Sequence, residues 1–529
     1  MLRARRSATI RAMPHAPHCL ARFAAAGVAR LTRLTRLTRL TGLVLVVSLA
    51  AAGPAQAQAL PEPVRATLAR AEVPPDALGA IAIPLAGLAR TWSYRAELPM
   101  QPASTIKLLT SIVALDRLGP NLRSRTELLA TGPMVDGVLR GDLVLRGGAD
   151  PDFGWPQLWA LLEELRAQGV QEIAGDLVLD RTLFTPARED VGVPPFDESP
   201  EWPYNVIPDA LHLNGSLLGI ELRAGTDSWQ ARTVPQIDGV AFESDGLQLV
   251  DGTCARWSTG WQRPTVRDAG DRVVIGLRGT FPRACTARAE LSLVERTRLA
   301  GLAFGTWWAR LGGSWSGRVR EAGAPAGARV LAQRESRPWG EVLRGLNKRS
   351  DNPQTRLLFL LLGVNAPPTP AGLEQQASTR ARADAVVRGW LDANGIGHAG
   401  VVLDNGSGLS RSERIAPRQL AQAIAVAHAS PYWSDLHMSM PVVGVEAAVR
   451  LRDSPAAGRA RLKPGGLRNV ASLAGIVPDP QGRPWAFVAM VNHAHAARAI
   501  PALHALVDWV ARGQPLDANA LRGPLAEGP

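Results

Sequence analysis

The sequence predicts an α+β protein of about two to four domains. The length gives the number of domains, and a hydrophobic pattern that changes between helical and alternating spacing along the chain gives the fold class. The chain has 529 residues, 46% of them apolar and 20% charged, which is typical of a globular protein. Residues 102–119 carry apolar side chains at helical spacing. From about 121 to 320 the pattern changes to short alternating strands and turns, and near the C-terminus NVASLAGIV and RPWAFVAMVN flank the turn PDPQGR.

The first predicted element is an export signal over residues 1–59. An Arg-rich stretch ends in the low-complexity run LTRLTRLTRLT, and the apolar core LVLVVSLAAAG (43–53) precedes AQAQA, which offers cleavage after Ala57 or Ala59. The apolar run is short for a membrane-spanning helix, so we favour a cleaved signal over a permanent N-terminal anchor. We therefore expect a periplasmic, exported protein without a stable transmembrane anchor, either soluble or loosely associated with the membrane.

The charge and the cysteines agree with export. Residues 1–57 contain nine Arg and neither Lys nor acid, so subtracting nine from the net charge of +12 leaves +3. The basic character belongs largely to the leader, which argues against a nucleic-acid partner. Cys254 and Cys285 are the pair that remains outside the leader, and in an oxidising compartment they predict a disulfide. Two unrelated buried thiols are the alternative.

Lysine usage points to chemistry. Only three of the 59 basic residues are Lys, namely Lys107, Lys348 and Lys463. Arg is effectively always protonated, whereas a desolvated Lys can lose its proton and act as a base. A Lys that persists in an Arg-rich chain is therefore a candidate for a role that Arg cannot fill.

The first candidate site lies in the predicted helix PASTIKLLTSIVALDRLG (102–119). Ser104 and Lys107 are three residues apart, so they share one helix face and can touch. A Ser near the start of a helix also gains from the helix dipole, which favours a developing alkoxide. Ser104 is the predicted nucleophile and Lys107 its base.

Two further motifs follow in order. Ser350-Asp351-Asn352 comes directly after Lys348-Arg349, and Lys463-Pro464-Gly465-Gly466 precedes the predicted strand pair. Ser-x-x-Lys, Ser-Asp-Asn and Lys-x-Gly in this order form the motif set of penicillin-interacting serine enzymes. All three lysines lie in or beside one of these motifs.

The sequence here resembles the D-alanyl-D-alanine carboxypeptidase/endopeptidases of the penicillin-binding protein 4 type (low-molecular-mass class C penicillin-binding proteins). PASTIKLLTS, NKRSDN and LDNGSGLSR (403–411) carry this resemblance, as does the long gap between the first two motifs. The resemblance implies a penicillin-binding/β-lactamase-like transpeptidase fold, an antiparallel sheet flanked by helices with a helical subdomain. It also implies β-rich domains inserted between the first and second motifs.

The predicted domain order follows from this. The catalytic domain comprises residues 60–120 and 321–515, the inserted domains occupy 121–320, and a tail covers 516–529. Within the insertion GDLVLRG (141–147) and GDLVLD (175–180) flank the helix PQLWALLEELRAQG, a strand–helix–strand unit. A nested inner domain, at about 215–295, contains both cysteines.

The expected reaction is acyl transfer through a Ser104 ester, on peptidoglycan stem peptides and on β-lactam antibiotics. Lys463 would lower the Lys107 pKa by charge repulsion. Further predicted roles are proton relay by Ser350, substrate and lysine contacts by Asn352, substrate contacts by Gly465 and Asp180, and an oxyanion hole from the backbone N–H groups of Ser104 and Gly466. For Asp180, capping of a turn is an equal alternative. No metal and no cofactor is needed.

Pro464 departs from the family pattern, because that position is usually a Thr whose hydroxyl helps to hold the substrate carboxylate. Proline is tolerated in a strand only where its nitrogen faces away from the ladder. The flanking alternation still predicts an active-site strand, so we expect acylation to persist and carboxylate recognition to be weakened.

Three functions remain open at this stage. The first is an exported D-Ala-D-Ala carboxypeptidase or endopeptidase, which the intact serines, Asn352 and lysines favour. The second is a related β-lactamase or esterase, for which the inserted domains would be unnecessary. The third is a catalytically weakened or inactive peptidoglycan-binding homologue. The sequence fixes neither the balance between the two peptidase activities nor the oligomeric state.

Overall fold

The structure, a computed structural model, describes residues 59–243, 246–366 and 377–514. The predicted signal peptide, apart from its last residue, and the predicted tail at 516–529 lie outside the described residues. Within the described residues, every helix falls short of the length and apolar character needed to cross a membrane.

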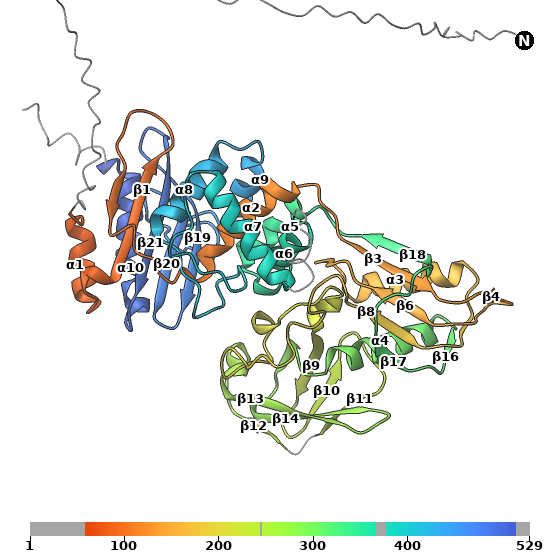
Figure 1. Cartoon of the computed structure of the whole chain (residues 1–529). Helices are drawn as coiled ribbons and strands as arrows, with labels where there is room; N and C mark the ends of the chain where they lie inside the picture. The colour runs from red at the N-terminus through yellow and green to blue at the C-terminus, as the bar shows by residue number, and fades with distance from the viewer. Residues whose placement is uncertain (1–58, 244–245, 367–376, 515–529) are drawn as a thin grey trace, which may run out of the picture. The chain divides into compact units, whose positions relative to one another are not determined.

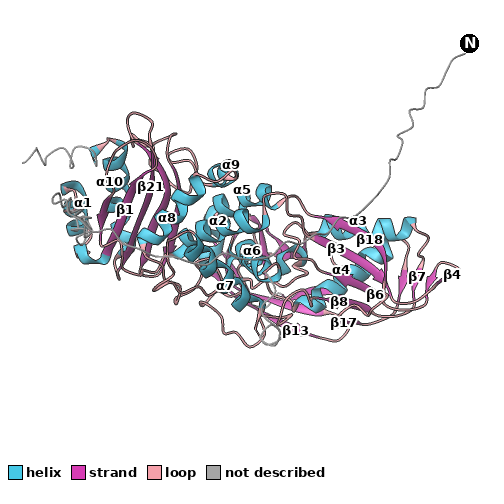
Figure 2. Cartoon of the chain, turned by 45° about the horizontal axis from the view of Figure 1, so that its top comes forward, coloured by secondary structure: helices cyan, strands magenta, loops and turns pink. Residues whose placement is uncertain are grey.

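The predicted α+β class is confirmed, with helices packed on sheets (Figure 2). The main sheet is antiparallel and contains the predicted C-terminal strand pair, in which Val470 lies opposite Asn492 and Pro478 opposite Pro484. Its strands run in the order β19 (Arg461–Leu467), β20 (Val470–Pro478), β21 (Pro484–Asn492), β1 (Leu78–Pro84) and β2 (Trp92–Tyr94).

Helices cover both faces of this sheet (Figure 1). In β21, Val488 and Met490 face one hydrophobic core, and Phe487 and Ala489 face the other, as the strand period of two requires. The second core also contains α1 (Glu62–Arg70) and α10 (Ile500–Ala511). On the first face lies α8 (Pro417–His428), followed by α2 (Ile106–Leu118), α5 (Trp339–Arg349), α6 (Asn352–Val364), α7 (Thr379–Ala393) and α9 (Trp433–Ser439).

Helix α2 is the buried centre of the helical layer, and its residues from Ile106 to Leu115 are all buried. It is shorter than the predicted helix at 102–119, because Ala103–Thr105 forms a 3₁₀ turn before it. It ends where Gly119 takes a φ of 75°, a left-handed conformation that glycine adopts without strain. Ser104 therefore lies on the tight turn that leads into the helix.

The inserted part begins with two mixed sheets. One has the strand order β17 (Val319–Glu321), β8 (Leu177–Asp180), β6 (Leu143–Arg146), β3 (Arg125–Ala130) and β18 (Arg329–Glu335). The other contains β16 (Ser314–Trp315), β7 (Glu172–Ile173), β5 (Val138–Leu139) and β4 (Met134–Val135). The predicted strand–helix–strand unit is confirmed: α3 (Trp155–Ala167) connects β6 to β8, which are parallel with Leu143 opposite Leu177.

Strand β18 lies within the predicted second catalytic segment but pairs with a strand of the inserted part. The prediction placed residues from 321 onward in the catalytic domain, but Arg329–Glu335 pairs antiparallel with β3 of the inserted sheet. Short alternating strands look alike on either side of a domain border, so the sequence pattern did not locate it. We propose that the chain returns to the catalytic body at about Ser336.

The inner strands form two further sheets, and the predicted disulfide joins two of the segments that connect these strands. Cys254 and Cys285 are bonded, so this prediction is confirmed. The first sheet has the strand order β10 (Trp229–Thr233), β9 (Leu218–Ala224) and β15 (Thr286–Leu291). The second has the order β11 (Val240–Glu243), β14 (Val273–Pro282) and β12 (Leu247–Val250), and β13 (Trp261–Asp268) also pairs with β14. Together with α3 and α4 (Arg296–Arg310) they share one hydrophobic core.

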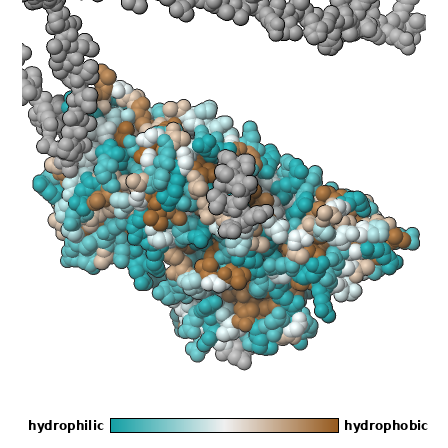
Figure 3. Space-filling view, in the orientation of Figure 1, coloured by the Kyte–Doolittle hydropathy of each residue, from teal (hydrophilic) through white to brown (hydrophobic). Residues whose placement is uncertain are grey.

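Hydrophilic residues cover much of the face shown in Figure 3, with hydrophobic residues in scattered patches between them.

Candidate active site

Lys107 is fully buried and lies against the predicted nucleophile. Its Nζ is 3.1 Å from Ser104 Oγ and 2.6 Å from Asn352 Oδ1, and it also donates to the carbonyl oxygen of Ser407. Three residues from distant parts of the chain thus surround one amine. Ala103, beside the nucleophile, has a φ of 46°, which is unusual for a residue other than glycine and is a form of strain found at functional sites.

The second motif forms the junction between α5 and α6. Ser350 ends α5 in a left-handed conformation with a φ of 59°, and the Asp351 side chain caps α6 by accepting the N–H of Gln354 at 2.9 Å. This junction turns Ser350 and Asn352 toward the lysines. The Asn352 amide is held at both ends, because its Nδ2 donates to the carbonyl oxygen of Tyr204 at 3.1 Å.

The third motif supplies a second buried amine. Lys463 is 1% exposed, and its Nζ donates to Ser350 Oγ at 2.8 Å and to the carbonyl oxygen of Pro464 at 2.9 Å. Burial lowers the pKa of Lys463 to about 7. Burial is also the main cause that lowers the pKa of Lys107 well below its ordinary value, and the charge of Lys463 adds to it. The prediction named desolvation for the lysines in general and, for Lys107 itself, the charge of Lys463, which is the smaller of the two causes.

Strand β19 is the edge of its sheet, and this explains how it accommodates Pro464. The N–H of Leu462 points outward, away from β20, because it donates to Pro441 at 3.0 Å. Backbone N–H directions alternate along a strand, so positions 464 and 466 point outward as well. Pro464 therefore removes no ladder hydrogen bond, and the N–H of Gly466 faces the cleft side of the edge.

Gly465 is required by close packing against the nucleophile's backbone. A Cβ at this position would lie 2.3 Å from Ser472 Oγ and 2.9 Å from Ser104 N. At Gly466, by contrast, a Cβ would have nothing within 4 Å. The two glycines thus differ in kind: the first lets the strand approach Ser104, and the second leaves open space in the cleft.

The loop at 403–411, which the sequence singled out only by resemblance, closes over Lys107. The Glu413 carboxylate is fully buried and its Oε1 accepts backbone N–H groups of Asn405 and Gly406 at 3.0 and 2.8 Å. Thr110 of α2 donates to Gly406 O at 2.7 Å. These contacts fix the carbonyl oxygen of Ser407 on the lysine.

A cleft of about 360 Å³ opens at Ser104. Its walls come from all three motifs and from the inserted part, which contributes residues that the sequence prediction missed. Tyr204 Oη donates to Asp197 Oδ2 at 2.8 Å, and Arg411 stacks on Phe196 with 4.8 Å between the guanidinium carbon and the ring centre. The lining residues are Ser104, Phe196, Asp197, Glu198, Tyr204, Ser350, Asn352, Gly408, Leu409, Arg411, Gly466, Leu467 and Arg468.

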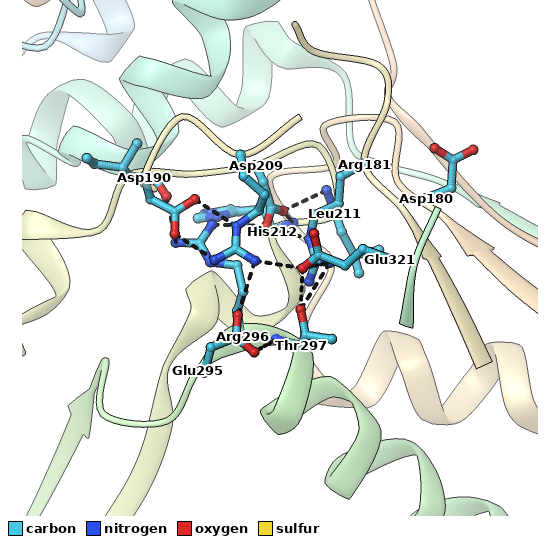
Figure 4. A network of polar contacts seen from close by, with 12 residues as sticks. Asp180, Arg181, Asp190, Asp209, Leu211, His212, Glu295, Arg296, Thr297 and Glu321 are labelled. Carbon is cyan, nitrogen blue, oxygen red and sulfur yellow. Dashed lines mark hydrogen bonds and ion pairs between the residues drawn. The ribbon is translucent and has the colours of Figure 1, made fainter. Parts of the chain in front are cut away.

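A buried ion-pair network holds the segment at 190–209 that carries these missed residues (Figure 4). Asp209 Oδ2 accepts Arg181 Nε at 2.7 Å and Arg296 Nη1 at 2.9 Å. Arg296 also pairs with Asp190 at 3.3 Å. Burial alone would raise the pKa of Asp209, but the charges of Arg296 and Arg181 outweigh it and hold this pKa far below its usual range.

Two residues that the sequence analysis named lie apart from this cluster. Asp180 does not line the cleft; it accepts the backbone N–H groups of Thr182 and Ala324, both at 2.9 Å, which is the turn-capping alternative. Figure 4 shows Asp180 apart from the contacts of the ion-pair network. Lys348 forms an ion pair with Glu446. The other predicted residues, Ser104, Lys107, Ser350, Asn352, Lys463, Gly465 and Gly466, gather around the cleft.

Known proteins share this architecture. The sequence matches the D-Ala-D-Ala carboxypeptidase 3 (S13) family over residues 60–512. It is 27% identical over 411 residues to the D-alanyl-D-alanine carboxypeptidase DacB of Haemophilus influenzae, covering 75% of this chain and 82% of that protein. It is 29% identical over 448 residues to a D-alanyl-D-alanine carboxypeptidase of an Actinomadura species, covering 80% of each.

The crystal structure of penicillin-binding protein 4 from Haemophilus influenzae is similar, with a TM-score of 0.65 and 25% identity over 79% of this chain and 90% of that one. That similarity confirms the predicted penicillin-binding/β-lactamase-like fold and the predicted resemblance. A complex of the same Haemophilus protein with a β-lactam has a TM-score of 0.64 and 24% identity, over 82% of this chain and 96% of that one. The match over residues 60–512 settles the family: this chain belongs to the D-Ala-D-Ala carboxypeptidase 3 (S13) family.

Proposed function

We propose that this protein is an exported serine D-Ala-D-Ala carboxypeptidase, with endopeptidase activity on cross-linked peptides, that acts on peptidoglycan stem peptides and is acylated by penicillins. The observation that carries this proposal is the position of Lys107, buried between Ser104 Oγ, Asn352 Oδ1 and the carbonyl oxygen of Ser407. Family membership supports the same reaction class.

The surroundings of Lys107 suit a neutral amine. A neutral amine has two N–H donors and one lone pair. Asn352 Oδ1 and the Ser407 carbonyl oxygen can only accept, so they take the two donors. The lone pair is then directed at Ser104, whose hydroxyl can donate as well as accept. The lowered pKa of Lys107 is the property that such a base needs at neutral pH.

The acylation step follows from these contacts. Ser104 Oγ attacks the carbonyl carbon of the penultimate D-alanine, and its proton moves to Lys107 Nζ. The oxyanion is stabilised by the backbone N–H groups of Ser104 and Gly466. The peptide C–N bond then breaks, and Ser350, whose Oγ accepts from Lys463 Nζ, passes the proton that Lys107 took from Ser104 on to the leaving amine, so both lysines return to their starting protonation states. Water hydrolyses the ester, yielding the shortened peptide and free Ser104.

A weakened enzyme is the second candidate, and Pro464 favours it. This residue offers no hydroxyl to the substrate carboxylate, and the loss of a hydrogen bond to a charged group costs about 1.5–3 kcal/mol. Lys463 could hold the carboxylate in part, but its Nζ already contacts Ser350 and Pro464. The strained ring of a β-lactam is acylated more readily than a peptide bond, so penicillin labelling persists where peptide turnover is weak, and the two assays together separate the candidates.

The test uses a fluorescent penicillin and a peptide ending in D-Ala-D-Ala, with the parent protein, Ser104→Ala and Pro464→Thr. Labelling of the parent and of Pro464→Thr but not of Ser104→Ala supports the acyl-enzyme. An increase of about tenfold or more in D-alanine release by Pro464→Thr supports the weakened enzyme. Absence of labelling in all three proteins would overturn the proposal. Cleavage of a cross-linked peptide dimer measures the endopeptidase activity.

A further inference from the structure

A second pocket, of about 700 Å³, lies beside the active-site cleft. Its walls come from the segment at 186–208, from α6 and from the loop at 404–411. Phe196, Leu409 and Arg411 contribute to both the pocket and the cleft, so the stacked pair of Arg411 on Phe196 stands between the two. The volume is within the range of about 300–1,000 Å³ that is usual for small-ligand sites.

Most ionic side chains in this pocket are already paired. Arg380 Nη1 donates to Asp404 Oδ1 at 2.7 Å, and Arg296 pairs with Asp190. Arg411 has the Phe196 ring beneath its guanidinium. The two ion-paired arginines are satisfied within the protein, and Arg411, which forms no ion pair among the described residues, is exposed to water, so none of the three calls for a ligand. Two other charged residues of the wall, one of each sign, differ from them.

The first is Arg356, which lies one turn after Asn352 on α6. Its side chain is 8% exposed, and its one hydrogen bond is a long one, from Nη2 to Leu409 O at 3.5 Å. Among the residues that the structure describes, its Nε has no hydrogen-bond partner and its guanidinium forms no ion pair. Asp404, Glu413 and Glu189 act on it only through their more distant charges. A buried guanidinium without a paired carboxylate is costly.

The second is Glu189. Its carboxylate lines the same pocket, is partly buried and takes part in no hydrogen bond or ion pair within the described part of the chain. Burial raises its pKa, whereas the charges of Arg380 and Arg356 act in the opposite direction. Among the described residues, the pocket thus contains one buried cation and one partly buried anion that form no ion pair. They lie between apolar walls formed by prolines, Phe359 and Leu360.

We propose that this pocket binds a short zwitterionic peptide, with the peptide carboxylate on Arg356 and its ammonium group on Glu189. Both charged ends of such a ligand would then be paired, and its side chains would contact the apolar wall. The volume suits a peptide of a few residues and is larger than a single small amino acid needs. The proposal does not depend on the acyl-transfer mechanism.

The contacts of Arg356 give the ligand a route to the reaction centre. Leu409 O, which accepts from Arg356, belongs to the loop whose Ser407 carbonyl oxygen accepts from Lys107. A carboxylate that pairs with Arg356 would also neutralise a charge that lowers the pKa of Lys107. Occupancy of the pocket should therefore shift the pH profile of Ser104 acylation toward higher pH.

Calorimetry with three peptides tests the proposal: L-trialanine, its N-acetyl derivative without the ammonium group, and its amide without the carboxylate. The purified protein should bind L-trialanine about tenfold or more tightly than either derivative. Arg356→Met should bind L-trialanine and the amide equally, yet still discriminate against the N-acetyl peptide. Glu189→Gln should show the reverse pattern.

The matched control is Arg388→Met, because Arg388 pairs with Asp384 on α7 and does not line the pocket. This variant should keep both preferences. Glu189→Gln, at a less buried position, serves as the decisive variant if Arg356→Met does not fold. The proposal is overturned if L-trialanine fails to bind or if the parent binds all three peptides with equal affinity. It is also overturned if both variants keep the parent's preferences.

Discussion

Lys107 and Asn352 are 245 residues apart in the sequence, and Lys107 Nζ donates to Asn352 Oδ1 at 2.6 Å. An amide oxygen at this distance accepts a hydrogen bond without adding a negative charge. It can therefore orient the amine and still let it lose its proton, which a carboxylate would prevent.

Asn352→Asp is expected to suppress acylation at neutral pH. An opposite charge this close to an amine raises its pKa by about 1–3 units, so Lys107 would stay protonated and could not accept the Ser104 proton. The second-order rate of penicillin labelling, measured from pH 6 to 10, should recover at alkaline pH. Asn352→Ala should lower the rate without this alkaline shift, and an unchanged profile in Asn352→Asp would contradict the role of Lys107 as a base.

Lys463→Met should remove part of the pH dependence of stability. The pKa of Lys463 is about 7 in the fold and about 10.4 in an unfolded chain. Between these values the unfolded state binds more protons, so the free energy of unfolding rises with pH. The slope for one such group is at most about 1.4 kcal/mol per pH unit. Urea unfolding should show that the free energy of unfolding rises more between pH 7 and pH 9.5 in the parent than in Lys463→Met. An equal rise in both proteins would contradict the lowered pKa of Lys463.

Gly465→Ala and Gly466→Ala should differ although they are neighbours. The first places a Cβ 2.3 Å from Ser472 Oγ and 2.9 Å from Ser104 N. We therefore expect Gly465→Ala to lower the free energy of unfolding by about 1–3 kcal/mol and to reduce penicillin labelling. The second has free space and keeps its backbone N–H, so stability should stay within about 0.5 kcal/mol. Thermal unfolding and labelling check both, and equal losses would refute the packing argument.

Asp209→Ala should be strongly destabilising because it removes the buried carboxylate to which Arg181 and Arg296 donate. Removing one partner of a buried ion pair costs about 3–5 kcal/mol. Asp268→Ala is the matched control, since Asp268 is 62% exposed and lies 3.7 Å from Arg298. Urea unfolding measures the difference. A loss below about 1 kcal/mol in Asp209→Ala, comparable to that of an exposed pair, would show that the network contributes little.

The motif residues could be named from the sequence because short motifs encode local geometry. Ser104 and Lys107 meet as a consequence of their spacing, and the lysines stood out by their rarity. The strand–helix–strand unit and the C-terminal hairpin were predictable from periodicity for the same reason.

Contacts between distant segments were not predictable in this way. Asp197 and Tyr204 enter the cleft from a proline-rich loop without periodicity. The sequence analysis named Asp180 as a substrate contact, whereas the acidic residues of this part of the cleft wall are Asp197 and Glu198. The sequence pointed to desolvated lysines in general, but the finding that burial outweighs the charge of Lys463 at Lys107 depends on how α2 packs.

The main sheet joins the two ends of the described chain, with Leu78 of β1 opposite Val491 of β21. Such pairing closes a very long loop, and long-range β pairing is intrinsically slow to form. Lys463, on β19 of that sheet, reaches Ser350 only once the sheet is assembled. A chain that is still being synthesised would therefore carry Ser104 without its second lysine, and completion of the chain would itself control when the hydrolase begins to act.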